Sequence, residues 1–241
     1  MSIKKSSIDI AGKKLTVETG VLAKQSSGAV TVRYGDTLVL CTANSASEPK
    51  DGINFFPLQV EYREKFYGAG KIPGGYFKRE ARPSEKEILS ARLTDRPIRP
   101  LFPKDFKCET QVIINLLSSD QENPGDILGT LGASIALMIS DIPWNGPIAS
   151  LRLGFIDGKT IVNPTFEELE KSTLDLVMTG TSDSIIMMEA ESKEISEEDL
   201  LTVVQYGHEV IKDLIDFQID FIKDIAKEKR VVETDEIEKK L

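Results

Sequence analysis

The sequence predicts a single α+β domain in which a mixed sheet packs against helices. Segments with β-type alternation fill the first third of the chain, and helices are interspersed among the later strands. The 241 residues can bury a sizeable core, and 40% hydrophobic with 29% charged content is typical of a folded globular protein.

Two hairpins are expected at the N-terminus. "SSIDIAGKKLTVETG" alternates around a Gly12-Lys13 turn, and "AVTVRYGDTLVLCTAN" alternates around Gly35-Asp36. "FFPLQVEY" continues the strands and leads into a Gly/Pro-rich loop over 68–75.

A helix is expected from about Ser84 to Arg96. Ser84 and Glu87 have the spacing of a capping box, and Pro97 is expected to stop the helix.

The second half alternates strands and helices. The expected order is the buried strand "CETQVIINLLS", the apolar helix "DILGTLGASIALMIS", a hairpin turning at Asp157-Gly158, the short helix "TFEELEKS" and the strands "LDLVMTG" and "SIIMMEA". A long terminal helix begins near Ser196 and is expected to reach Lys229. We therefore predict one domain over 1–229 and the start of a linker over 230–241.

Composition excludes several protein classes. The longest apolar runs, such as "ASIALMIS", are too short to span a bilayer, and the N-terminus lacks the apolar core of a signal peptide. Cys41 and Cys108 make neither a metal cluster nor a disulfide framework, which suits small core residues in a reducing cytoplasm. We expect a cytoplasmic protein with no membrane partner.

A basic island interrupts an acidic protein. The chain carries a formal charge of -9, yet residues 71–107 carry +5 and the remainder carries -14. Such a local island indicates an anionic ligand. Lys78, Arg79 and Arg82 are expected to contact phosphates, and Tyr76 and Phe77 offer faces on which bases stack.

Three further arginines admit two interpretations. Arg92 and Arg96 are four residues apart and project from one face of the predicted helix. With Arg99, they either bind an anion or pair structurally with Asp95, Glu85 or a neighbouring subunit.

Other candidate sites fail on spacing. "GAGK" at 68–71 lacks the glycine and the Ser or Thr of a phosphate loop, and Pro73 breaks a dinucleotide fingerprint. His208 lacks a second member for a dyad or metal site, so we interpret it as structural. Trp144 is interpreted as a packing residue.

Long motifs carry a family resemblance. "KIPGGYFKREARPSEKEILSARLTDRPIRPLFP", "GASIALMISDIPWNGPIASLRLG", "VNPTFEELEKSTLDLVMTGT" and "VVQYGHE" resemble the first RNase PH-like core of the bacterial polynucleotide phosphorylase family, over nearly the whole chain. The resemblance implies an RNase PH-like α+β fold. It also implies an enzyme, a polyribonucleotide nucleotidyltransferase that degrades RNA from the 3′ end with inorganic phosphate and releases nucleoside diphosphates in mRNA turnover.

The resemblance also implies partners and cofactors. Such chains carry two cores, a helical linker domain and C-terminal RNA-binding domains, and three chains form a ring around single-stranded RNA. Magnesium and phosphate serve the full-length enzyme, and none is expected on this chain alone. The family's constriction loop falls on Tyr76, Phe77, Lys78 and Arg79, with Tyr76 and Lys78 as mild departures. Arg92, Arg96 and Arg99 are implied to lie near the active site of the second core.

Matching this chain to the family's second core leaves no catalytic or metal residue here. Gly125 and Asp126 stand where that core has a serine pair for phosphate. Leu169, Asp175 and Val177 stand where it has two aspartates and a lysine, so only Asp175 remains. This core is expected to build the ring and guide RNA.

Three functions stay in view. The first is a phosphorylase fragment that guides RNA, and the second is a self-contained phosphorolytic enzyme. The third is a stand-alone, non-enzymatic RNA-binding ring subunit. The missing serine pair and lysine count against the second. The chain's own oligomeric state, its RNA sequence preference and its protein partners are not predicted.

Overall fold

Ten strands and four α-helices make up the described chain. The computed structural model describes residues 3–76, 78–80 and 82–232. The strands are β1 (Lys4–Ile10), β2 (Lys13–Thr19), β3 (Gly28–Tyr34), β4 (Thr37–Ser45), β5 (Leu58–Glu64), β6 (Thr110–Ser118), β7 (Ala149–Ile156), β8 (Lys159–Val162), β9 (Leu174–Gly180) and β10 (Ile185–Ser192). The helices are α1 (Glu85–Ile98), α2 (Asp126–Ile139), α3 (Phe166–Lys171) and α4 (Glu197–Ile222).

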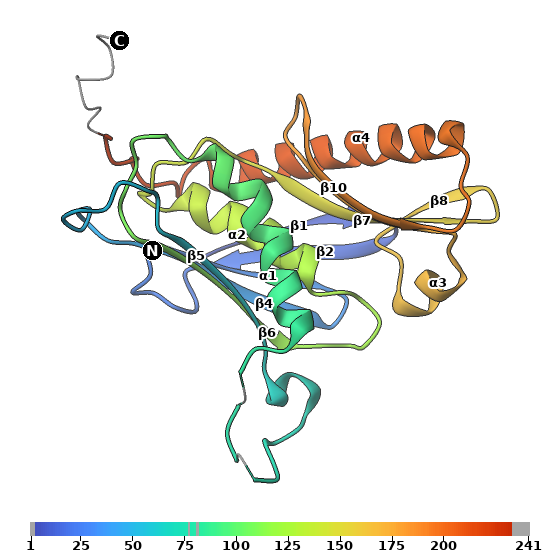
Figure 1. Cartoon of the computed structure of the whole chain (residues 1–241), viewed down its shortest axis with the longest axis horizontal. Coiled ribbons are helices and arrows are strands. Elements are labelled where there is room, and N and C mark those ends of the chain that lie inside the picture. The colour runs from blue at the N-terminus through green and yellow to red at the C-terminus, as the bar shows by residue number, and fades with distance from the viewer. Residues whose placement is uncertain (1–2, 77, 81, 233–241) are drawn as a thin grey trace.

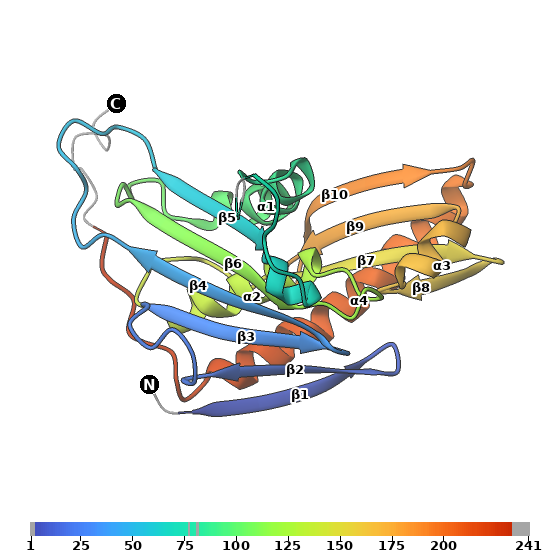
Figure 2. The ribbon, with the colours of Figure 1, turned by 90° about the horizontal axis from the view of Figure 1, so that it is seen from below.

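The strands form two sheets that lie side by side (Figure 2). Within the described residues, the first sheet has the order β1-β2-β3-β4-β6-β5 and the second β10-β9-β7-β8. All neighbours are antiparallel except β5 and β6, which are parallel. The first sheet is therefore mixed, which confirms the predicted α+β class with its long C-terminal helix.

Helix α2 is a central element that contacts strands of both sheets. It packs on β3, β4, β6 and β7, and it also contacts α1 and α4 (Figure 1). Small residues allow this close approach: a Cβ added at Gly132 would lie 2.4 Å from the Cys41 sulfur, and one at Gly28 would lie 1.9 Å from the Ala136 carbonyl oxygen. Both cysteines, Cys41 and Cys108, are buried and unpaired, as expected of small core residues.

Helix α1 extends two residues further than the sequence predicts. Pro97 lies inside its last turn, and the helix ends at Ile98. Proline removes one backbone donor, but the Arg99 N–H still bonds to the Asp95 carbonyl and both Pro97 and Ile98 are buried. The prediction that Pro97 stops the helix is therefore wrong.

Helix α4 ends at Ile222, seven residues before the expected end at Lys229. The chain beyond it bonds to the body of the protein: the Lys227 N–H donates to Ile139 O and the Arg230 N–H to Asp141 O. These tertiary bonds replace the intrahelical ones. They tie residues 227–230 to the end of α2, while the boundary at 229/230 stays a prediction.

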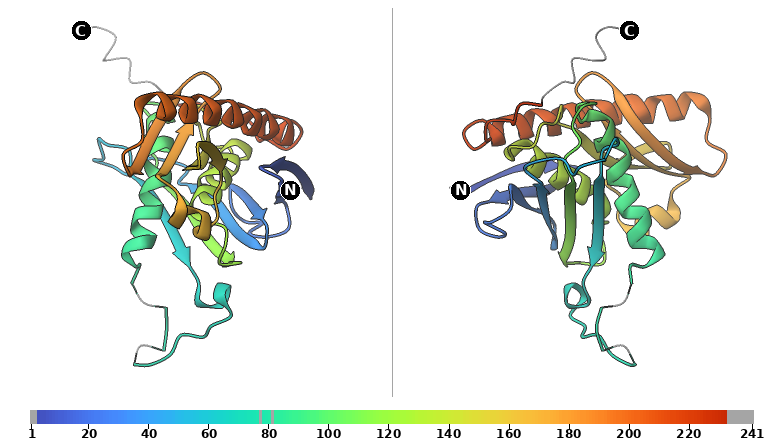
Figure 3. Two further views of the ribbon diagram at one scale, coloured as in Figure 1. Left: turned by 90° about the vertical axis from the view of Figure 1, so that its right-hand side faces the viewer. Right: turned by 60° about the vertical axis from the view of Figure 1, so that its left-hand side comes forward.

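The segment between β5 and α1 projects from the rest of the protein (Figures 1 and 3). It begins with a short 3₁₀ helix over Phe66–Ala69, and the Ser119 N–H donates to Gly68 O at 3.1 Å. In the part of the chain that the structure describes, no helix combines the length and apolarity needed to cross a bilayer.

Candidate nucleic-acid interface

The base of the projecting segment is fixed by a glutamate at the start of α1. The Glu87 carboxylate accepts from the Ser84 N–H at 2.6 Å and from the Glu64 N–H at 2.8 Å. Ser84 Oγ accepts in turn from the Glu87 N–H, which completes the predicted capping box. Partial burial raises the pKa of Glu87, but the bonds from Ser84 and Glu64 outweigh it and hold the pKa below its ordinary value.

A second glutamate lies further along the same segment. Glu80 Oε2 pairs with Lys65 Nζ at 3.0 Å, and its Oε1 accepts from the Phe66 N–H at 3.3 Å. Glu80 and Glu87, together with the groups that they bind (Lys65 Nζ and the N–H groups of Glu64, Phe66 and Ser84), are called the neck. Residues 71–82, which include Glu80, are called the cationic loop.

The cationic loop carries four basic residues and one acid. Lys78, Arg79 and Arg82 are exposed, and no residue in the described ranges forms an ion pair with them. The Tyr76 side chain is also exposed, at 94%. Phe77, for which we predict base stacking, lies outside the described residues. The three cations and Tyr76 therefore stand on one projecting segment, as an RNA-contacting loop requires.

Arg92 and Arg96 on α1 and Arg99 at its C-cap differ in their ion pairs. Arg96 Nη1 pairs with Glu189 on β10 at 2.8 Å, with both side chains at least half exposed. Arg99 bonds to Asp95 through two nitrogens and to Leu58 O at 3.2 Å. Arg92 is exposed and has no ion pair within the described chain. Exposed pairs contribute little energy, so Arg96 remains available to another partner.

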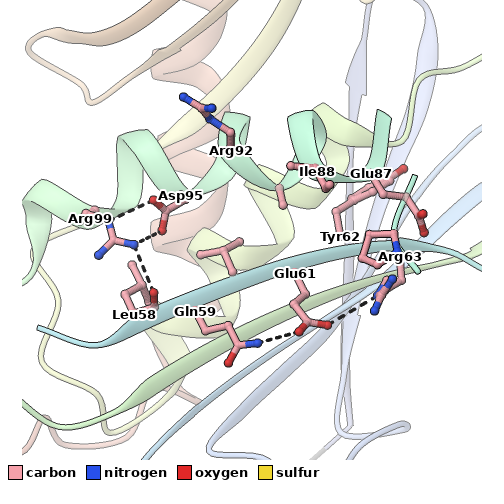
Figure 4. Close-up of a pocket in the computed structure, with 13 residues that line it drawn as sticks. Leu58, Gln59, Glu61, Tyr62, Arg63, Glu87, Ile88, Arg92, Asp95 and Arg99 are labelled. Atoms are coloured by element: carbon pink, nitrogen blue, oxygen red, sulfur yellow. Dashed lines mark hydrogen bonds and ion pairs between the residues drawn. The ribbon is translucent and has the colours of Figure 1, made fainter. Parts of the chain in front are cut away.

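A pocket of about 380 Å³ lies between β5 and α1. Figure 4 shows Arg99 bonded to Asp95 on one side, and Glu61 between Gln59 and Arg63 on the other. Charges of both signs line it, and β5 is the edge strand of its sheet. Such a mixed lining does not select an anion.

Asp126 and Asp175, two of the residues that the resemblance matches to a catalytic set in a second core, both approach one arginine. Arg152 Nη2 pairs with Asp126 Oδ2 at 3.0 Å, and Arg152 Nε lies 3.5 Å from Asp175 Oδ1. Burial raises the pKa of Asp175, and the Arg152 charge opposes this rise. Val177 is buried in β9. Arg152 is not among the residues predicted from the sequence, although a single cation in the apolar strand "ASLRLGFI" is a usable signal.

Gly125 has a packing reason to lack a side chain. A Cβ there would lie 2.8 Å from Tyr62 Oη and 3.0 Å from Leu116 Cδ1. A serine at this position would therefore have to displace both side chains. Leu169 is half-buried on α3 and carries no polar group.

The remaining polar candidates have structural partners. His208 Nε2 lies 3.0 Å from Thr181 O, and Trp144 Nε1 donates to Ile98 O at 3.0 Å from a buried ring. The interpretation of both residues as structural is consistent with these bonds. Among the residues described, no three His, Cys, Asp or Glu side chains gather as metal ligands would.

Comparison with known families decides the relationship. Residues 11–143 match the description "3' exoribonuclease family, domain 1", and residues 146–210 match "3' exoribonuclease family, domain 2". The chain belongs to the 3′ exoribonuclease family. This membership confirms the family and the RNase PH-like fold that the sequence motifs predict.

Several bacterial members of this 3′ exoribonuclease family are similar over most of the chain. Polyribonucleotide nucleotidyltransferase of Heliobacterium modesticaldum is 51% identical over 235 residues, which are 98% of this chain and 33% of that protein. The enzymes of the same name from Thermomicrobium roseum and Halalkalibacterium halodurans are 53% and 55% identical, over 95% and 92% of this chain and 29% and 32% of theirs. The chain thus spans about a third of the length of these relatives.

A solved structure shares the fold at low identity. The crystal structure of rice (Oryza sativa) Rrp46 aligns with a TM-score of 0.66 at 15% identity, over 89% of this chain and 92% of that one. This likeness supports the fold alone.

Proposed function

We propose that the chain is the N-terminal RNase PH-like core of a phosphorolytic 3′-to-5′ exoribonuclease, a polyribonucleotide nucleotidyltransferase acting in RNA degradation. Family membership and 51–55% identity to three enzymes of that name support this assignment. The reaction would consume inorganic phosphate and release nucleoside diphosphates from the RNA 3′ end.

Within that enzyme, the role of this core is to guide single-stranded RNA. The observation that carries the role is the cationic loop: Lys78, Arg79 and Arg82 are exposed and unpaired within the described chain, although the protein as a whole has a charge of -9. Phosphates of RNA supply the missing counter-charge, and Tyr76 and Phe77 add stacking faces for bases.

Catalysis is assigned to a second core beyond this chain. Asp126 and Asp175 already share the Arg152 guanidinium, so they do not fit a magnesium ion, which would have to displace that charge. We propose that magnesium and phosphate bind at the second core, and we assign no chemical step to this one.

The proposed partners are the second core of the same chain and two further copies in a trimeric ring. Arg92 and Arg96 lie on α1, and with Arg99 they are proposed to face the active site of the second core. A stand-alone ring subunit is less favoured, because the three relatives carry the name of an enzyme. Cytoplasmic location stays a prediction.

Charge reversal tests the guiding role. Arg79→Glu with Arg82→Glu in the full-length enzyme should weaken binding of single-stranded RNA and flatten its salt dependence. The log–log slope should fall by about 0.7 for each phosphate that the loop no longer neutralises. Filter-binding titrations at several salt concentrations measure both. Unchanged affinity and slope would show that the loop does not contact RNA.

A further inference from the structure

The neck joins both ends of the projecting segment through a single carboxylate. Glu64 ends β5 and Ser84 precedes α1, and the backbone N–H groups of both residues donate to Glu87. These two donors are twenty positions apart in the sequence. Closing a flexible loop of that length costs entropy, and the two bonds to Glu87 help to offset that cost.

Glu80 bonds the second half of the projecting segment to its first residues. Its two oxygens hold the Lys65 ammonium and the Phe66 N–H, while Arg79, directly before it, and Arg82, two residues after it, are exposed. The Lys65 and Glu80 side chains are only 28% and 35% exposed. The residue beside Arg79 is thereby anchored to the start of the segment, directly after the end of β5.

The charges of these two glutamates oppose the function of the loop that they support. A carboxylate beside an RNA-binding loop repels phosphate, so its Coulombic effect alone lowers affinity for RNA. Its hydrogen bonds hold the loop in one arrangement and thus reduce the entropy lost on binding, which raises affinity. The two effects have opposite signs and can be separated by experiment.

We propose that Glu87 and Glu80 are positioning residues for RNA, which act by holding the cationic loop in its binding arrangement. The proposal rests on the RNA-guiding function of that loop. In this proposal the two glutamates raise RNA affinity without contacting RNA, because a carboxylate in contact with a phosphate would repel it.

The test uses isosteric neutral variants in the full-length enzyme. Glu87→Gln loses one acceptor for a backbone N–H, and Glu80→Gln loses the charge that pairs with Lys65. Each should lower affinity for single-stranded poly(A) about fivefold, although each removes a negative charge. Trypsin should also cleave faster after Lys78 and Arg79 in both variants, as mass spectrometry of short digests would show.

Two matched controls separate positioning from charge and from helix capping. Glu85→Gln removes an exposed acid next to the neck that makes no bond in the described chain, and it should leave affinity unchanged or slightly higher. Glu168→Gln weakens the equivalent capping box of α3, which makes none of the neck's bonds, and should leave RNA binding and loop cleavage unchanged. Glu80→Gln leaves the α1 cap intact, so its result stands even if Glu87→Gln is poorly folded.

The outcomes show separately whether the positioning role fails and whether the RNA-guiding function fails. If Arg79→Glu with Arg82→Glu weakens RNA binding while both neck variants bind as well as the wild type or better, the neck has no positioning role. If the arginine variant binds RNA normally, the guiding function is wrong and the inference falls with it. Weaker binding in all three, with normal binding in both controls, supports the proposal.

Discussion

Arg152 on β7 and Asp126 at the first position of α2 form a largely buried ion pair. The Nη2–Oδ2 distance is 3.0 Å, and the side chains are 14% and 13% exposed. Arg152 also approaches Asp175, so one cation lies between two carboxylates. Asp126 is thus paired with a buried cation, which its position in the sequence alone does not reveal.

Removing Arg152 should destabilise the fold. Arg152→Met would leave Asp126 buried without its cation, which costs about 3 kcal/mol of unfolding free energy in such pairs. Urea unfolding measures the loss. Arg33→Met is the control, because the Arg33 pair with Asp36 is exposed and should be worth less than about 1 kcal/mol. Equal losses in the two variants would contradict a structural role for the Arg152 cluster.

The loop between β6 and α2 should make stability depend on acid pH. Partial burial raises the pKa of Asp120, but hydrogen bonds from the Asn123 and Glu122 N–H groups, the Asn123 side chain and Thr37 outweigh it and hold the pKa well below its ordinary value of 3.8. Since the folded pKa is depressed, the stabilisation is fully present above about pH 4 and is lost as the pH falls below that value.

Asp120→Asn tests this dependence. The difference in unfolding free energy between wild type and variant should be constant from pH 7 to about pH 5 and should shrink below pH 4. Urea titrations at pH 7, 5, 4 and 3 provide the comparison. A difference that stays the same at pH 3 would show that the Asp120 charge contributes nothing.

Lys229 should stabilise the end of α2. Its Nζ donates to Leu137 O at 2.7 Å, Met138 O at 3.1 Å and Ser140 O at 2.8 Å, which satisfies carbonyls that a helix end leaves free. Lys229→Met should therefore lower the unfolding free energy by about 1–3 kcal/mol. Thermal and urea unfolding measure the loss. Lys212→Met is the control, because that side chain is 40% exposed and pairs with an exposed glutamate. An unchanged unfolding free energy in Lys229→Met would contradict the capping role.

Tyr76 should act through RNA rather than through stability. Tyr76→Ala should weaken binding of single-stranded RNA by about 1–3 kcal/mol if the ring stacks on one base, and Phe77→Ala should do the same. Since Tyr76 is 94% exposed, its loss should change the melting temperature little. A sharp fall in melting temperature with intact RNA affinity of the folded fraction would instead indicate a ring that anchors the loop.

The order of elements could be predicted from the sequence because it depends on local patterns. Alternation indicated the hairpins around Gly12 and Gly35, and the capping box placed the start of α1. The ends of helices failed where tertiary bonds compete with local signals. Pro97 is buried inside the last turn of α1, and the helix continues past it. The backbone of Lys227 and Arg230 bonds to the end of α2, so α4 does not continue through these residues.

The basic residues of the candidate site could be predicted from the sequence, whereas the bonds that hold its surroundings in place could not. The basic residues at 78, 79 and 82 form an island visible in the sequence, and they are exposed on the projecting segment. The bond from the Glu64 N–H to Glu87 and the pairing of Arg152 with Asp126 join residues 23 and 26 positions apart. No local pattern encodes such pairings, since they depend on how distant strands and helices meet.

This core is proposed to bind RNA without processing it, so its ability to phosphorolyse RNA is the decisive measurement. The purified chain is incubated with poly(A), inorganic phosphate and magnesium, and ADP release is measured. We expect none, because Gly125 supplies no side-chain donor for phosphate, Asp126 and Asp175 are held by Arg152, and Val177 carries no charge. ADP release that survives further purification and is abolished by Asp175→Asn would contradict this expectation and place a catalytic centre in this core.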